Sequence, residues 1–129
     1  SSKKIIYRIR IDKNNKITKK IIFKKFSQKE GFPDGMTLDK NKNLWVTHYG
    51  GGCISIFNPR GKKVHKIDFP AKNITNCNFG GVNKNEVFIT SALKDMTKKE
   101  IKKFKYSGSL FWLKTNMKGI ISKSFNVNL

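Results

Sequence analysis

The chain contains few of the residues that mark nucleic-acid readers, disulfide-bonded proteins and thiolate metal sites. Among its 28 basic residues only Arg8, Arg10 and Arg60 are arginines, although readers of phosphates and base edges favour arginine. The 2 cysteines, Cys53 and Cys77, lack Cys-x-x-Cys spacing, which argues against a zinc site and against a disulfide framework. We therefore expect two reduced thiols in a cytoplasmic protein.

Long apolar runs are also absent from the sequence. No stretch approaches the ~20 residues that a membrane-spanning helix needs, so we expect no membrane partner. Residues 1–4 (SSKK) lead straight into a strand without the apolar segment of a signal peptide. We expect no leader here, although a start so close to a strand leaves open a targeting segment further upstream.

The charge is strongly positive, with a formal net charge of +20 and 37% hydrophobic residues. Such a charge is typical of proteins that bind polyanions. However, the lysines are spread over every segment, and the sequence is also rich in Asn, Ile and Phe, as an AT-rich coding bias would produce. We interpret most of the charge as adventitious and expect no specific nucleic-acid partner. Binding of an acidic partner through the Lys-rich surface, without enzymatic activity, is the alternative.

Apolar and polar residues alternate between turn motifs along the whole chain, which predicts an all-β fold. Thr97 and Glu100 form a capping-box pattern, which predicts one short inserted helix near residues 97–105. The predicted strands are residues 5–11, 17–26, 36–39, 44–49, 53–57, 64–69, 78–81, 86–90, 109–114 and 119–125.

The strand pattern repeats along the chain, since Leu44-Trp45-Val46-Thr47 is matched by Val87-Phe88-Ile89-Thr90. Four short strands every ~40–45 residues is the period of a β-propeller. We predict one domain over residues 1–129, a partial β-propeller of about two and a half four-stranded blades. Residues 1–30 are the outer strands of one blade, 31–70 a complete blade, and 71–129 a complete blade with an insertion at 93–108. We expect the C-terminal part of a longer propeller; the alternative is a small protein that closes its ring by oligomerising.

The run Gly31-Phe32-Pro33-Asp34-Gly35 opens the first complete blade and places a carboxylate at the expected mouth of the central channel. Hard divalent cations prefer oxygen ligands, and a carboxylate beside a metal can accept a proton from an attacking water. Asp34 is therefore the candidate metal ligand and general base. The alternative is an ordinary turn residue, because Pro-Asp-Gly is a turn motif in any protein.

Three further residues are expected on the rim of the same pocket. His48 and Tyr49 end the second strand of the blade, and Cys77 follows Asp34 at the spacing of the repeat. His48 is a candidate ligand or proton carrier, although a single histidine at a strand end is more often structural. Cys77 is expected to be an apolar wall or a buried, inert thiol rather than a nucleophile.

The sequence resembles the senescence-marker-protein/regucalcin/gluconolactonase family of six-bladed propellers. The resemblance rests on Pro33-Asp34-Gly35-Met36, Leu44-Trp45-Val46 with Gly51-Gly52, Phe79-Gly80-Gly81 and Gly108-Ser109-Leu110-Phe111. It implies a metal-dependent hydrolase, commonly a lactonase acting on sugar lactones. It also implies a single divalent cation at the top of the central channel, Ca²⁺ first, with Mg²⁺, Zn²⁺ or Mn²⁺ as alternatives.

The resemblance further implies three protein ligands for that cation: a Glu from an early blade, an Asn from a middle blade and the Asp of the Pro-Asp-Gly motif. In this sequence that Asp is Asp34, and the other two ligands would precede Ser1. We therefore expect no activity from this chain alone. Its expected partners are a sugar lactone and either the missing N-terminal blades or another copy of the chain. A related propeller esterase or phosphotriesterase remains the other enzymatic alternative.

Overall fold

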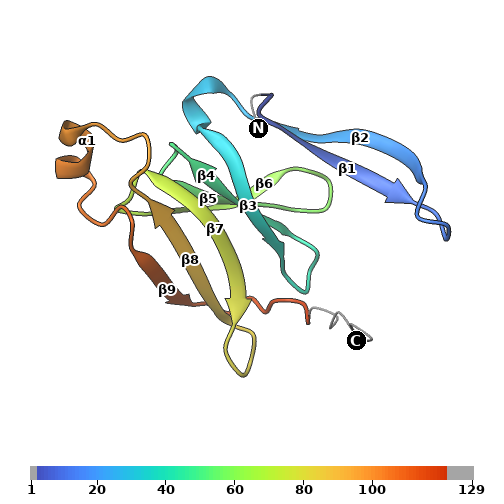
Figure 1. Cartoon of the computed structure of the whole chain (residues 1–129). Helices are drawn as coiled ribbons and strands as arrows, with labels where there is room; N and C mark the ends of the chain where they lie inside the picture. The colour runs from blue at the N-terminus through green and yellow to red at the C-terminus, as the bar shows by residue number, and fades with distance from the viewer. Residues whose placement is uncertain (1–2, 122–129) are drawn as a thin grey trace, which may run out of the picture.

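A computed structural model describes residues 3–121. Over these residues the chain forms three antiparallel sheets and one short α-helix, as the strand pattern predicts. Figure 1 shows the sheets side by side, with the β1–β2 ribbon projecting from the four-stranded sheet. No helix in the described part of the chain is long and apolar enough to cross a membrane.

The first sheet is a two-stranded ribbon of β1 (Ile5–Ile11) and β2 (Ile17–Lys25). Its turn is held by the Asp12 carboxylate, which accepts hydrogen bonds from backbone amides in the turn. A 3₁₀-helix, η1 (Gln28–Glu30), then connects the ribbon to the second sheet.

The second sheet is a four-stranded blade in sequential order. Its strands are β3 (Phe32–Leu38), β4 (Leu44–Tyr49), β5 (Cys53–Phe57) and β6 (Lys63–Asp68). The pairing of β3 with β4 shifts between Pro33 and Met36, so Asp34 and Gly35 form a bulge. The Pro-Asp-Gly motif therefore lies inside β3 instead of in a turn before it.

The third sheet consists of β7 (Asn73–Gly80), β8 (Glu86–Ala92) and β9 (Leu110–Lys114). Between β8 and β9 lies α1 (Lys98–Lys103), where Thr97 and Glu100 form the predicted capping box.

Two boundaries of the third sheet differ from the sequence prediction. β7 starts at Asn73 instead of Asn78, because Asn73 already pairs with Ala92 and its side-chain amide donates to the Lys94 carbonyl at 2.8 Å. Of the predicted strand at 119–125, Gly119 makes an isolated bridge to Asp39, and residues 122–125 lie outside the described residues.

Apolar side chains pack between neighbouring sheets and cover both faces of the four-stranded blade. Trp45 meets Phe79 of the third sheet edge-on, with ring centroids 5.0 Å apart. On the opposite face, Phe57 meets Phe26 at 5.8 Å. Edge-to-face pairs of this kind contribute about 0.5–1.5 kcal/mol beyond the area that they bury. The blade that carries Asp34 is therefore fixed from both sides.

Asp39, which follows β3 at the start of the connection to β4, is a buried carboxylate that is only 1% exposed. It accepts a hydrogen bond from the Asn43 amide at 2.9 Å and another from the Trp45 indole N–H at 3.2 Å. The aspartate of this turn therefore fixes both the β3–β4 connection and the core tryptophan.

Candidate functional site

Asp34 lies on the innermost strand of its blade, in the bulge of β3. β3 pairs only with β4, and the Asp34 side chain is exposed. Among residues 3–121 its carboxylate has no hydrogen bond and no ion pair. Partial desolvation raises the pKa of the Asp34 carboxyl. The Asp34 carboxylate is therefore exposed and has no partner in the described part of the chain.

The bulge that carries Asp34 is held by its two neighbours. A Cβ atom on Gly35 would lie 2.6 Å from the Cα of Asn76, so only glycine allows β7 to approach this closely. The fully buried Thr47 hydroxyl lies 2.9 Å from the Gly35 carbonyl and 3.1 Å from the Thr75 carbonyl. Thr75 lies at the register shift of β7. Thr47 therefore connects the bulges of two neighbouring blades and positions the strand of Asp34.

Cys77 does not occupy the bulge of the third sheet. That bulge contains Thr75, and Cys77 follows in regular pairing with Ile89. Its side chain is 2% exposed within the core cluster, and burial raises the pKa of its thiol to about 12. Spacing along the sequence therefore places Cys77 too close to the pocket, because the two strands bulge at different points of the repeat.

His48 lies beneath the rim, since it is only 1% exposed. Phe26 packs against its ring, with centroids 5.2 Å apart, and its Nδ1–H donates to the Glu30 carbonyl at 2.7 Å. Desolvation by burial lowers the pKa of His48, so the ring is neutral at physiological pH. Its Nε2 has no hydrogen-bond partner in the described part of the chain. His48 therefore has a structural role, because its hydrogen bond to Glu30 connects η1 to the end of β4.

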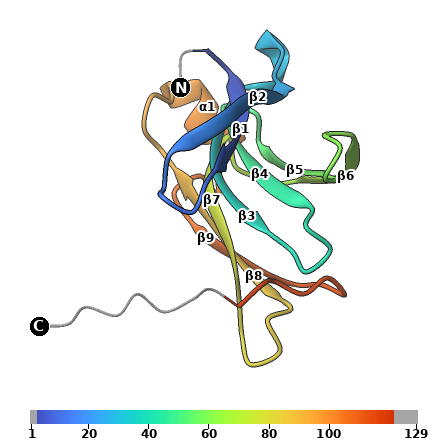
Figure 2. The ribbon, with the colours of Figure 1, turned by 90° about the vertical axis from the view of Figure 1, so that its right-hand side faces the viewer.

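Tyr49 connects the two blades at the end of β4. Its hydroxyl lies 2.9 Å from the Asp95 carboxylate and 3.0 Å from the Lys94 carbonyl. Desolvation, then the hydrogen bond and charge of Asp95, and then the charge of Asp34 raise its pKa. Figure 2 shows α1 at the opposite end of the sheets from the β3–β4 and β7–β8 turns. The insertion after β8 thus lies at the same end as Tyr49.

A cleft of about 420 Å³ opens at this end of the sheets. Phe32 and Tyr49 form aromatic parts of its lining, and the loop carboxylate of Asp95 closes another side. Further lining residues are Lys4, Gln28, Lys29, Lys72 and Asn73. The sequence prediction finds Tyr49 alone of these residues, because the others come from four separate segments that only the fold brings together.

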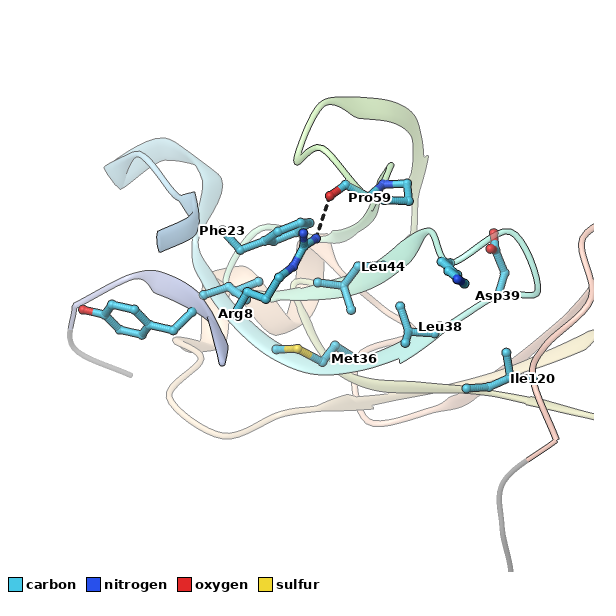
Figure 3. Close-up of a pocket in the computed structure, with 11 residues that line it drawn as sticks. Arg8, Phe23, Met36, Leu38, Asp39, Leu44, Pro59 and Ile120 are labelled. Atoms are coloured by element: carbon cyan, nitrogen blue, oxygen red, sulfur yellow. Dashed lines mark hydrogen bonds between the residues drawn. The ribbon is translucent and has the colours of Figure 1, made fainter. Parts of the chain in front are cut away.

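A larger cavity of about 600 Å³ lies between the β1–β2 ribbon and β3–β4 (Figure 3). Its lining is mainly apolar, with Met36 and Leu38 of β3 on one side. Two of its charged members have partners, since Arg8 donates to the Pro59 carbonyl and Asp39 accepts from Trp45. For Lys42, the third, no side-chain hydrogen bond or ion pair is found among the described residues. The carboxylate of this lining is therefore buried and already engaged.

The described residues contain no group of three or more His, Cys, Asp or Glu side chains close enough to hold a metal ion. Asp34 is an exposed oxygen ligand of the kind that a hard cation requires. The described carboxylates, histidines and cysteines do not complete a cation site around it.

A family model described as the SMP-30/gluconolactonase/LRE-like region matches residues 1–93. The chain belongs to this family. The Bacillus subtilis (strain 168) protein YvrE, named a candidate sugar lactone lactonase, is 42% identical over 88 residues, which are 67% of this chain and 30% of YvrE. Regucalcin of Xenopus laevis is 35% identical over 103 residues, which are 78% of this chain and 34% of that protein.

The chain spans about a third of the length of these two relatives. A crystal structure of a calcium-binding protein, regucalcin, from Agrobacterium tumefaciens matches the fold with a TM-score of 0.88 at 21% identity. The match covers 98% of this chain and 43% of that one, which confirms the fold as part of a regucalcin propeller.

Proposed function

We propose that this chain supplies part of the active site of a metal-dependent hydrolase that opens sugar lactones, with Asp34 as one ligand of a divalent cation. The observation that carries the proposal is the free carboxylate of Asp34, exposed on the bulge of the innermost strand. Membership of a family that includes gluconolactonases supports the choice of substrate. Ca²⁺ is the first choice of cation, because carboxylate and amide oxygens suit it.

The chemistry that a bound cation supplies is polarisation of the lactone carbonyl and stabilisation of the oxyanion that forms on it. Asp34 has two carboxylate oxygens. One oxygen can bind the cation, and the other can accept a proton from the attacking water. Thr47 and Gly35 keep that carboxylate in place through the bulge. The remaining ligands come, in this proposal, from other blades of the ring or from another copy of the chain.

The test is hydrolysis of glucono-1,5-lactone in a pH-stat, with Ca²⁺, at increasing concentrations of the chain. Asp34→Asn is compared with Asp68→Asn, which removes the same charge from an exposed residue on the outer strand β6. If another copy completes the site, the rate per chain rises with concentration. In Asp34→Asn the rate per chain should then be at least about tenfold lower than in the unmodified chain, a loss of about 1.4 kcal/mol or more in transition-state stabilisation.

An equal Ca²⁺-dependent rate in both variants contradicts the role of Asp34. A rate that never exceeds the uncatalysed reaction excludes completion by a second copy, and other blades are then the source of the missing ligands.

A further inference from the structure

The cleft beside Tyr49 contains a positive charge that the described part of the chain does not neutralise. Lys4 is 8% exposed, and its ammonium group donates to the Gln28 side-chain oxygen at 2.9 Å and lies 3.3 Å from the Gln28 carbonyl. The same group lies 4.2 Å from the centroid of the Phe32 ring. None of the ion pairs among residues 3–121 includes Lys4. Buried charges in proteins are normally paired with an opposite charge, so a partner from outside is expected.

The rest of the cleft does not supply that negative charge. Two more lysines line it, Lys29 and Lys72, and Lys72 is paired with Glu100 at 2.5 Å. Among the described residues, Asp95 is the one carboxylate of the cleft lining, and the Tyr49 hydroxyl lies 2.9 Å from it. The lining therefore has an excess of positive charge, and Coulomb attraction favours an anionic group in the cleft over a cationic one.

The neutral groups of the cleft suit a sugar. Phe32 and Tyr49 provide aromatic surface for the apolar side of a sugar ring. Gln28 and Asn73 provide amide groups at the same cleft, which can bond to hydroxyl groups. A few polar groups on a partly aromatic wall are typical of small-molecule sites.

The cleft is connected to Asp34 through β3. Phe32 and Asp34 are two positions apart and both are exposed, with the buried Pro33 between them. Two strand positions span about 7 Å. That distance is comparable to the length of a hexose, so a sugar that lies on Phe32 in the cleft can extend along β3 towards Asp34.

We infer that the cleft binds an anionic sugar derivative, whose phosphate or carboxylate group pairs with Lys4 while its other end faces Asp34. The inference rests on the proposed function for the identity of that other end as a lactone. The binding of the anionic group depends on the cleft alone and requires no cation.

The test is calorimetric titration in EDTA with glucose 6-phosphate, gluconate and glucose, so that it is independent of any metal site. Lys4→Met keeps the aliphatic stem and removes the charge, and Lys4→Arg keeps the charge. Lys19→Met is the matched control, because Lys19 is exposed on β2 and its loss changes the net charge equally. Circular dichroism melting of each variant establishes that it is folded.

The expected result is saturable binding of one anionic sugar and at least about tenfold weaker binding of glucose, since a charge-assisted hydrogen bond contributes 1.5 kcal/mol or more. Lys4→Met should weaken the binding of the anionic sugar at least about tenfold, whereas Lys4→Arg and Lys19→Met should leave the binding unchanged. A preference for glucose 6-phosphate identifies a phosphate group, and one for gluconate a carboxylate.

The inference is overturned if neither anionic sugar binds, if glucose binds equally well, or if Lys4→Met and Lys19→Met have the same effect. Because EDTA is present, these outcomes say nothing against Asp34. If the anionic sugar binds but no hydrolysis that depends on Asp34 is observed, that result counts against the proposed function alone.

Discussion

Replacement of Thr47 by valine should loosen the bulge that carries Asp34. Valine has nearly the shape of threonine but lacks the hydroxyl that lies against the Gly35 and Thr75 carbonyls. One hydroxyl hydrogen is shared between two partly buried carbonyls, and its removal leaves them without that donor, at a cost of about 1–3 kcal/mol. We expect Thr47→Val to lower the free energy of unfolding by about 2 kcal/mol.

Thr47→Ser is the matched control, because it keeps the hydroxyl and loses one methyl group, worth about 0.8 kcal/mol. Urea denaturation followed by tryptophan fluorescence measures both variants, and equal slopes against urea concentration establish that the unfolding transition is comparable. If Thr47→Val costs no more than Thr47→Ser, the hydroxyl bridge between the bulges does not hold the site, and the reasoning is wrong.

Three further predictions concern buried polar groups. Burial lowers the pKa of His48 below its unfolded value of 6.5, so the unfolded state binds more protons and the stability falls as the pH is lowered from 7.5 to 5.5. His48→Gln should flatten this pH dependence of the free energy of unfolding, measured in urea titrations; an unchanged dependence would contradict the prediction. Cys77, with its thiol pKa raised to about 12, should react with Ellman's reagent only after denaturation in urea. Asp39→Ala should destabilise the chain by about 3 kcal/mol and Asp12→Ala by about 1 kcal/mol, because both accept turn amides but only Asp39 is buried; equal losses in chemical denaturation would contradict this.

The sequence predicts the architecture well because its information is local. Alternation defines β1 and β2 almost to the residue, and the capping box of Thr97 and Glu100 defines α1. The Pro-Asp-Gly motif also leads to Asp34 on the innermost strand. Each of these features depends on neighbours in sequence or on a repeat that the sequence itself displays.

The remaining features depend on contacts between blades, which no local pattern reveals. His48 looks like an exposed strand end but is covered by Phe26 and η1. Asp39 looks like a turn residue but is buried under the Trp45 indole. Lys4 looks like one lysine among many, and its isolation becomes visible only when the cleft is assembled. Burial, and not residue type, distinguishes these positions.

The proposed function requires that the Asp34 carboxylate binds a divalent cation. Titration of the ¹⁵N-labelled chain with Mn²⁺ tests this requirement, because the paramagnetic ion broadens the amide signals nearest to it even when binding is weak. We expect the signals of Phe32 and of residues 34–36 to broaden first in the unmodified chain and in Asp68→Asn, and this early broadening to be lost in Asp34→Asn. Broadening that begins around another carboxylate, or that is unchanged in Asp34→Asn, would contradict the claim.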